Sequence, residues 1–204
     1  MAFTPRGLEW TEPLFQLIKE PPNKESHMAE EKSNVVLIGM PGAGKSTLGI
    51  VLAKIMALKF VDADLVIQEQ MDKTLQTIID AMGPDGFIQI ENEILSDLEA
   101  EETVIATGGS AIYSDEAMKH LSDIGVIVYL EISYDSLKGR LGDLQERGVV
   151  LKGGMGMSLR ELYDERKPLY EKYADIVVNV DDLNITAAAR KVACALDHCE
   201  ALAY

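Results

Sequence analysis

From residue 34 onward, short apolar runs alternate with longer amphipathic stretches. Val35-Val36-Leu37-Ile38 is a continuous, mostly β-branched run, typical of a strand that is buried on both faces of a parallel sheet. Similar runs predict strands over 59–62, 103–107, 124–130 and 176–180. Helical periodicity predicts helices over 46–58, 64–71, 75–82, 87–100, 115–121, 133–141, 158–173 and 185–202. This alternation predicts an α/β fold with a doubly wound, five-stranded parallel sheet and helices on both faces.

Two segments depart from the alternation. Residues 1–33 show no strand–helix rhythm, and we expect an N-terminal extension or tag with little structure. Ser26-His27-Met28 resembles a cloning junction. The segment before Met28 is therefore either an added tag or a native extension. Residues 34–204 form the one predicted domain. Within this domain the glycine-rich stretch 142–157 is either a lid over a nucleotide site or an ordinary surface loop.

Composition and charge narrow the class of protein. Of the 204 residues, 47% are hydrophobic, which is enough for a sizeable core. The net charge of −15 has the wrong sign for a protein that binds duplex nucleic acid or an anionic membrane. No apolar stretch approaches the roughly 18 residues of a membrane span. We therefore expect a cytoplasmic monomer that binds a small molecule. Cys194 and Cys199, with no Cys/His cluster beside them, are expected to be buried small residues.

A phosphate-binding motif follows the first predicted strand. Residues 39–47 read Gly-Met-Pro-Gly-Ala-Gly-Lys-Ser-Thr and fit the pattern G-x-x-x-x-G-K-[ST] between a strand and a helix. In such a loop the main-chain N–H groups and the helix N-terminus hold phosphate oxygens. Lys45 can reach the β- and γ-phosphates, and the Ser46 hydroxyl can ligate Mg²⁺. The alternative is a glycine-rich turn that binds nothing. The predicted nucleotide-binding residues of the loop are Gly39, Gly42, Ala43, Gly44, Lys45, Ser46 and Thr47.

Polar residues also follow the second and third predicted strands. Asp62 and Asp64 can both project from the carboxyl end of a strand, where open α/β sheets bind ligands. One could orient water on Mg²⁺ and the other could accept a proton from a substrate hydroxyl. The alternative is a helix N-cap at Asp64 with Asp62 on the surface. Thr107-Gly108-Gly109-Ser110 permits close approach of a ligand to the backbone, or is a plain turn.

The helix predicted over 158–173 contains Arg166 and Pro168. We expect Pro168 to kink or end the helix. Arg166 could then point toward the ligand, and a solvent-facing arginine is the ordinary alternative.

Taken in order, these motifs resemble the shikimate kinase family of P-loop enzymes. The resemblance covers about residues 34–180 and includes Gly86-Phe87 with Glu91 and Arg-x-Pro-Leu-Tyr at 166–170. It implies the strand order 2-3-1-4-5, ATP as donor, Mg²⁺ held by Ser46 with help from Asp62, and a step of aromatic amino acid biosynthesis. The resemblance also implies catalytic roles for Lys45, Asp64 and Arg147, and contacts of Arg140 and Arg147 with the nucleotide. It implies that the acceptor is contacted by Asp64, Gly108, Gly109, Ser110 and Arg166. Of these, Arg166 would hold the acceptor's carboxylate.

The sequence departs from the family pattern at three places. Ile88 stands where the pattern has an arginine that pairs with the shikimate carboxylate. Ser110 replaces the third glycine of a Gly-Gly-Gly, and the lid has Arg147-Gly148-Val149-Val150 in place of Arg-Pro-Leu-Leu. A lost arginine–carboxylate contact weakens binding by roughly 1.5–3 kcal/mol. The donor side therefore matches the family and the acceptor side is altered.

Three functions agree with these observations. The first is phosphoryl transfer from ATP to shikimate. The second is a kinase for another small alcohol or polyol without shikimate's carboxylate, which Ile88 and Ser110 favour. The third is a regulatory module that binds ATP without chemistry, against which Lys45, Ser46, Asp62 and Asp64 argue.

Overall fold

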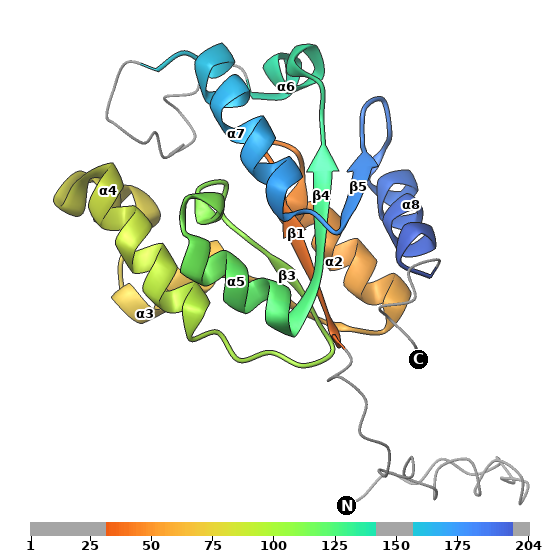
Figure 1. The fold of residues 1–204 in the computed structure, drawn as a ribbon, viewed down its shortest axis with the longest axis horizontal. Coiled ribbons are helices and arrows are strands. Elements are labelled where there is room, and N and C mark those ends of the chain that lie inside the picture. The colour runs from red at the N-terminus through yellow and green to blue at the C-terminus, as the bar shows by residue number, and fades with distance from the viewer. Residues whose placement is uncertain (1–31, 142–156, 198–204) are drawn as a thin grey trace, which may run out of the picture. The chain divides into compact units, whose positions relative to one another are not determined.

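A computed structural model describes residues 32–141 and 157–197. Its strands form one parallel sheet in the order β2-β3-β1-β4-β5, which confirms the predicted fold class and strand order (Figure 1). The strands are β1 (Asn34–Ile38), β2 (Lys59–Asp62), β3 (Thr103–Ala106), β4 (Gly125–Glu131) and β5 (Ile176–Asn179).

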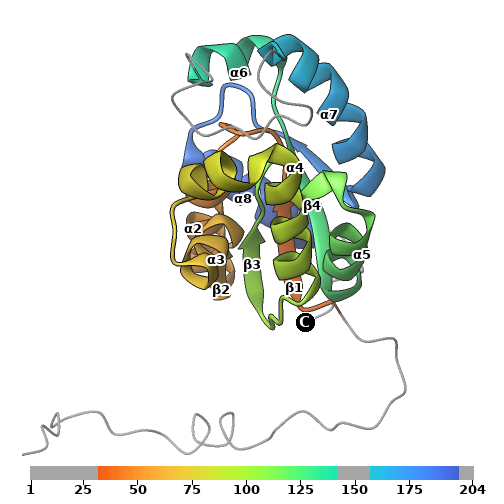
Figure 2. The same cartoon turned by 90° about the vertical axis from the view of Figure 1, so that its left-hand side faces the viewer.

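Helices cover both faces of the sheet (Figure 2). α2 (Lys45–Met56) and α8 (Ile185–Asp197) pack on one face, and α5 (Asp115–Ile124) and α7 (Leu159–Tyr173) on the other. α3 (Ala63–Met71) and α4 (Leu75–Ser96) pack against each other, and α4 also contacts α5. α6 (Tyr134–Leu141) follows β4, and a short 3₁₀ helix, η1 (Ala111–Tyr113), follows β3.

The core lies around the central strands. Every residue of β1 and β3 is buried, whereas the edge strands β2 and β5 are partly exposed. This is the expected result of continuous apolar runs at the centre of a sheet that is covered on both faces. A second, smaller apolar cluster centred on Ile67, Ile78 and Phe87 joins α3 to α4.

The prediction of separate helices over 75–82 and 87–100 is confirmed. They make up α4 and are separated by a non-helical break at Gly83 (φ 73°), and the second ends at Ser96 instead of residue 100. The expectation that Pro168 could end its helix was wrong. The helix α7 continues through Pro168 to Tyr173. The proline lacks an N–H for the carbonyl of Asp164, but both residues are exposed, so water can bind that carbonyl.

The prediction for Cys194 was also wrong. Cys194 is exposed, because the buried face of α8 is formed by Ala188, Ala189, Val192, Ala193 and Leu196. Cys199 lies outside the described residues, as do the predicted extension up to residue 31 and residues 142–156 of the predicted lid.

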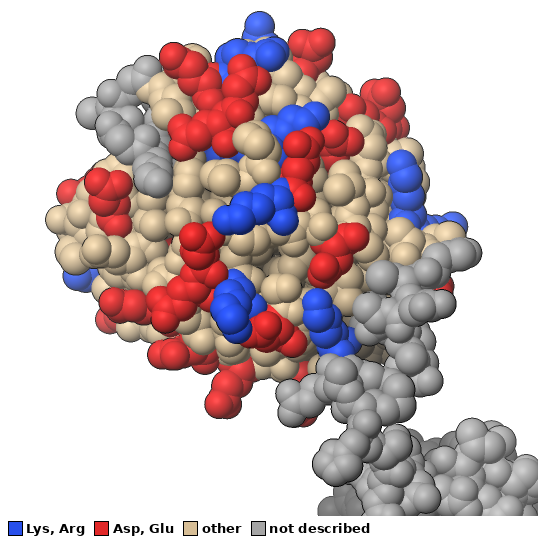
Figure 3. Space-filling model, viewed as in Figure 1, with Lys and Arg blue, Asp and Glu red and all other residues tan. Residues whose placement is uncertain are grey.

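Acidic and basic side chains are interspersed on the face shown in Figure 3, which has no broad basic area. Within the described parts of the chain, no helix is long and apolar enough to span a membrane.

Candidate functional site

The polar residues predicted to bind ligands meet at the carboxyl ends of three neighbouring strands. In the sheet register Leu37 of β1 and Asp62 of β2 both lie opposite Ala106 of β3. The loop after β1 therefore lies beside the residues that follow β2 and β3. This is the edge at which parallel α/β sheets bind ligands.

The loop after β1 has the backbone conformation that a phosphate cradle requires. Gly39, Gly42 and Gly44 all have positive φ values, of 144°, 85° and 100°. A Cβ at Gly39 would lie 2.8 Å from the carbonyl oxygen of Leu130 in β4, so only glycine fits there. Gly44 is the N-cap of α2 and supplies no side-chain cap. The first N–H groups of α2 are thus available for an anion.

Lys45 is buried within this loop. Its Nζ donates hydrogen bonds to the carbonyl oxygens of Gly39 (2.7 Å) and Met40 (3.2 Å). Burial lowers the pKa of Lys45 from 10.5 to about 8, and Asp64 is the carboxylate that opposes this shift most. The ammonium group is therefore held at the loop, with Asp64 close enough to act on it.

Other residues predicted to bind the nucleotide lie around the loop. Ser46 and Thr47 are exposed in the first turn of α2. Arg140, at the end of α6, donates hydrogen bonds from its guanidinium to the carbonyl oxygens of Ala43 (3.4 Å) and Val180 (3.2 Å). Arg140 thereby connects the loop to the end of β5. Arg147 lies outside the described residues.

Asp62 and Asp64 open α3. Asp62 is the N-cap, and its Oδ1 accepts a hydrogen bond from the main-chain N–H of Asp64 at 3.0 Å. The alternative that Asp64 is the N-cap was therefore wrong, and Asp62 is partly buried. Burial raises the pKa of Asp64, and the charge of Lys45 opposes the rise. The cap fixes Asp64 in the first turn of α3.

The glycines after β3 allow three elements to approach one another. A Cβ at Gly108 would lie 2.2 Å from Glu91 Oε1 and 3.0 Å from Asp64 Oδ1. A Cβ at Gly109 would lie 2.9 Å from a terminal nitrogen of Arg166. The two glycines therefore let α3, α4 and α7 bring their charged side chains to the loop after β3.

Glu91 belongs to a motif that carries the family resemblance, but the sequence analysis gave it no role in the site. It is 1% exposed, and its Oε2 accepts a hydrogen bond of 2.5 Å from the Ser110 hydroxyl. Burial raises its pKa from 4.5 to about 7. A signal was present, because Phe87, Glu91 and Leu95 are spaced four apart and share the buried face of α4. A carboxylate among core positions of a helix indicates a special role.

Arg166 is buried, so the solvent-facing alternative was wrong. It is 1% exposed, and its Nε donates a hydrogen bond of 3.1 Å to the hydroxyl of Tyr113. Its guanidinium lies 5.1 Å from the centre of the Tyr113 ring. Tyr170, one turn later, stacks on Tyr129 and donates a hydrogen bond of 2.8 Å to the carbonyl oxygen of Gly109. Two aromatic residues thus fix α7 and its arginine against the loop after β3.

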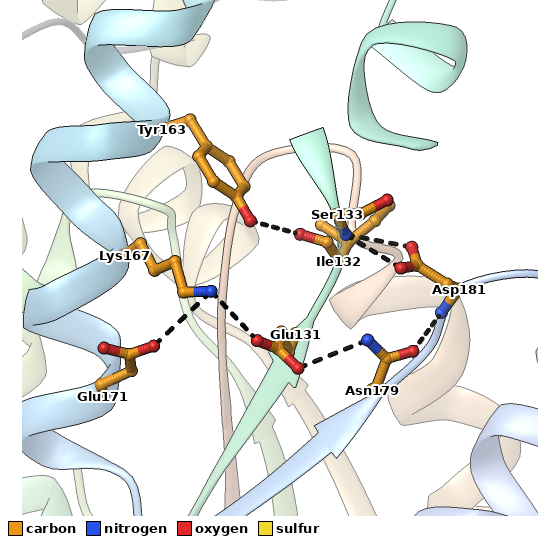
Figure 4. Close-up of polar contacts among 8 residues, drawn as sticks. All are labelled: Glu131, Ile132, Ser133, Tyr163, Lys167, Glu171, Asn179 and Asp181. Carbon is orange, nitrogen blue, oxygen red and sulfur yellow. Dashed lines mark hydrogen bonds and ion pairs between the residues drawn. The ribbon is translucent and has the colours of Figure 1, made fainter. Parts of the chain in front are cut away.

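A polar network on the strand side of α7 adds to this anchoring (Figure 4). Lys167 forms an ion pair of 3.3 Å with Glu131 at the end of β4, and Glu131 accepts a hydrogen bond from Asn179 of β5. Tyr163 donates its hydroxyl proton to the carbonyl oxygen of Ile132 at 3.0 Å. The helix that carries Arg166 is therefore attached to the end of β4 by side chains on either side of the arginine, and Glu131 connects this contact to β5.

Four charged residues from four helices form one electrostatic group. The charges of Asp64, Glu91 and Arg166 all affect the pKa of Lys45. The pKa of Glu91 in turn depends on Asp64, Arg166 and Lys45, and the pKa of Asp64 depends on Lys45. A phosphate loop on the central strand, with carboxylates and a buried arginine at the neighbouring strand ends, defines a P-loop small-molecule kinase.

Residues 41–197 match the shikimate kinase family, and the chain belongs to this family. It is 37% identical to a shikimate kinase from Vibrio parahaemolyticus over 163 residues, which are 79% of this chain and 95% of that protein. A shikimate kinase from Shewanella oneidensis is 36% identical over the same shares. Most of the described domain therefore has counterparts in these relatives.

Solved structures agree with the sequence relatives. A shikimate kinase from Acinetobacter baumannii in complex with shikimate superposes with a TM-score of 0.73 and 28% identity, covering 82% of this chain and 94% of that one. A shikimate kinase from Aquifex aeolicus gives a TM-score of 0.69 at 30% identity, covering 80% and 96%.

Proposed function

We propose that the protein transfers the γ-phosphoryl group of ATP to a hydroxyl of a small hydroxylated acid, with shikimate as the leading acceptor. The observation that carries the proposal is the placement of Asp64 against Lys45. Asp64 is the carboxylate that acts most strongly on the buried lysine of the phosphate loop. A carboxylate in that position can orient an acceptor hydroxyl toward the phosphoryl group that the lysine binds.

The donor side of the site fits a nucleotide with its magnesium ion. The glycine conformations and the uncapped start of α2 suit phosphate oxygens. Ser46 and Asp62 are the residues proposed to hold Mg²⁺, and Arg140 and Arg147 are proposed to contact the nucleotide. Among the described residues no group of three or more Asp, Glu, His or Cys side chains could hold a metal ion. That fits an ion bound chiefly through substrate phosphates, where it would neutralise charge on the transferred group.

On the acceptor side, Asp64 is proposed to accept the proton of the reacting hydroxyl, and Arg166 to bind the acceptor's carboxylate. Gly108 and Gly109 would let the acceptor approach the main chain, and Ser110 would line the same surface. Lys45 would neutralise charge that develops on the phosphoryl oxygens during transfer. Closure of the proposed lid would bring Arg147 to the phosphates and exclude water.

A second acceptor class is favoured by one observation. Ile88 packs against the apolar cluster between α3 and α4, so it supplies no charge for a carboxylate. A small polyol without a carboxylate would not need that charge.

A coupled assay of ADP release with a panel of alcohols tests the proposal. The panel contains shikimate and neutral polyols, and the Lys45→Ala variant serves as the blank. We expect turnover with shikimate. Turnover with a neutral polyol alone would favour the second acceptor class. ATP binding without turnover of any alcohol would exclude the kinase function and favour a regulatory module.

A further inference from the structure

The connection between β4 and α6 is held at one peptide group. The Ile132–Ser133 peptide bond contributes the carbonyl oxygen of Ile132 and the N–H of Ser133. That carbonyl oxygen accepts a hydrogen bond of 3.0 Å from the hydroxyl of Tyr163 on α7. The N–H donates to both carboxylate oxygens of Asp181, at 3.0 and 3.2 Å. The peptide group is therefore bound at both of its ends, by α7 and by the residues after β5 (Figure 4).

This peptide group lies directly before α6. The Ser133 hydroxyl accepts a hydrogen bond of 3.3 Å from the N–H of Ser136, and the Ser133 carbonyl oxygen accepts one of 2.9 Å from the N–H of Leu137. Ser133 thus caps α6, and fixing the peptide plane at the cap sets the direction in which the helix leaves the strand. Burial would raise the pKa of Asp181, but hydrogen bonds from Ser133 and Ser136 lower it below its ordinary value. Asp181 is therefore an ionised acceptor at neutral pH.

The far end of α6 returns to the same segment of the chain. Arg140 donates a hydrogen bond of 3.2 Å to the carbonyl oxygen of Val180, the residue that precedes Asp181. Its other terminal nitrogen donates to the carbonyl oxygen of Ala43 in the phosphate loop, at 3.4 Å. Two consecutive residues after β5 therefore bind both ends of α6, and the second end also contacts the phosphate loop.

We infer that Asp181 is a positioning residue for the nucleotide, because it fixes the start of the helix that places Arg140 against the phosphate loop. This inference rests on the nucleotide side of the proposed function, in which Arg140 contacts the nucleotide. Without the carboxylate, the N–H of Ser133 would lose its acceptor and α6 would adopt a range of positions. Nucleotide affinity would then fall with the fraction of molecules in which Arg140 lies at the loop.

A purely structural role for Asp181 predicts a different result. A carboxylate at the N-terminus of a helix stabilises the helix through its charge alone. Such a role would change the free energy of unfolding and leave nucleotide affinity unchanged. Asp135 is exposed in the first turn of α6 and carries the same charge at the same end of the helix. Asp135→Ala is therefore the matched control.

The dissociation constant for ADP, measured by titration calorimetry, tests the inference without turnover. We expect Asp181→Ala to raise this constant by roughly 3- to 10-fold. Asp181→Asn keeps an oxygen that can accept from the N–H of Ser133, so it should raise the constant by less than about twofold. KM for the acceptor should stay unchanged in both variants, and Asp135→Ala should bind ADP as wild type does.

The other end of the peptide group supplies a second variant, which serves also if Asp181→Ala does not fold. Tyr163→Phe removes the hydroxyl that binds Ile132 and keeps the edge-to-face contact of its ring with Tyr134. It should also weaken ADP binding, by roughly 2- to 5-fold. The effects of Asp181→Ala and Tyr163→Phe should multiply to more than the double variant shows, because either substitution alone releases the same peptide group.

Unchanged ADP affinity in Asp181→Ala and Tyr163→Phe would overturn the inference. An equal loss in Asp135→Ala would also overturn it, because the effect would then come from helix charge. A rise in acceptor KM equal to the rise in the ADP dissociation constant would do the same, since it would indicate a general structural role. None of these results would affect the proposed function.

The wild-type protein distinguishes the two levels of the argument. Wild type that binds no ADP would overturn the nucleotide side of the proposed function, and the inference with it. Wild type that binds ADP and phosphorylates no acceptor would overturn the proposed kinase function alone.

Discussion

The hydroxyl of Tyr170 donates a hydrogen bond of 2.8 Å to the carbonyl oxygen of Gly109. This contact joins α7 to the loop after β3, which lie 61 positions apart in the sequence. Because Arg166 approaches the same glycine from the same helix, the bond sets the distance between the arginine and the loop.

The Tyr170→Phe variant should weaken acceptor binding selectively. The ring still stacks on Tyr129, so the variant loses only the contacts of the hydroxyl group, with the carbonyl oxygen of Gly109 and with Arg166, at about 1 kcal/mol. We expect KM for the acceptor to rise by about fivefold and KM for ATP to stay unchanged. Steady-state kinetics measure both. Tyr173→Phe, which removes a hydroxyl from the exposed contact with Asp115, is the control. Equal changes in both KM values would contradict the positioning role.

The Gly108→Ala variant should disturb Glu91. The added Cβ would lie 2.2 Å from Glu91 Oε1, and since φ of Gly108 is not positive, the contact alone causes the effect. We expect a loss of about 1–3 kcal/mol in the free energy of unfolding and a fall in acceptor turnover.

Gly139→Ala is the matched control for this substitution. A Cβ there meets nothing within 4 Å, and α6 should gain helix propensity of up to about 1 kcal/mol. Urea denaturation measures both variants. A Gly108→Ala protein as stable and active as Gly139→Ala would show that the Glu91 position tolerates displacement.

ATP affinity should fall as pH rises above about 8. The triphosphate binds the ammonium form of Lys45, whose pKa is lowered to about 8, so at higher pH binding must first add a proton. Each pH unit above 8 should weaken ATP binding by a factor that approaches ten, and ATP binding should be accompanied by proton uptake. Isothermal titration calorimetry in buffers of different ionisation enthalpy measures both. Lys45→Met should lack the uptake, and Lys54→Met, at an exposed position of α2, should retain it.

The Asp64→Asn variant should lose turnover and retain ATP binding. An amide cannot accept the proton of the acceptor hydroxyl, so kcat should fall by about 100-fold or more. The dissociation constant for ATP, measured by titration calorimetry, should change by less than about threefold. Asp85→Asn, at an exposed position in α4, is the control. A parallel loss of ATP affinity and turnover would remove Asp64 from the acceptor side.

Stability should depend on pH through Glu91. Because the folded state raises the pKa of Glu91 from 4.5 to about 7, the folded protein holds this proton more tightly than the unfolded chain does. The free energy of unfolding should therefore fall as pH rises from about 4.5 to about 7, by up to roughly 3 kcal/mol from this group, and level off above. Glu91→Gln should be stabilised relative to wild type at pH 8 more than at pH 5. Urea denaturation at both pH values is the measurement, and parallel profiles would refute the shift.

Much of the site was predictable because its residues belong to local motifs. Lys45 follows a glycine pattern that specifies its own backbone, and Asp64 follows a strand whose carboxyl end must face the ligand side. Glu91 and Tyr170 belong to motifs of the family resemblance, but nothing in their neighbouring residues indicates what their side chains contact. Their roles depend on contacts with Ser110 and Gly109, which are distant in sequence.

The amino-acid sequence by itself determined the parallel sheet and the phosphate loop, because apolar periodicity and glycine spacing are properties of neighbouring residues. The strand order followed from the family resemblance. Only the tertiary structure decided that Arg166 is buried, that Cys194 is exposed and that α7 continues through Pro168. It alone also revealed that Asp181 and Tyr163 bind the same peptide group, since hydrogen-bond partners and burial are set by which elements pack together.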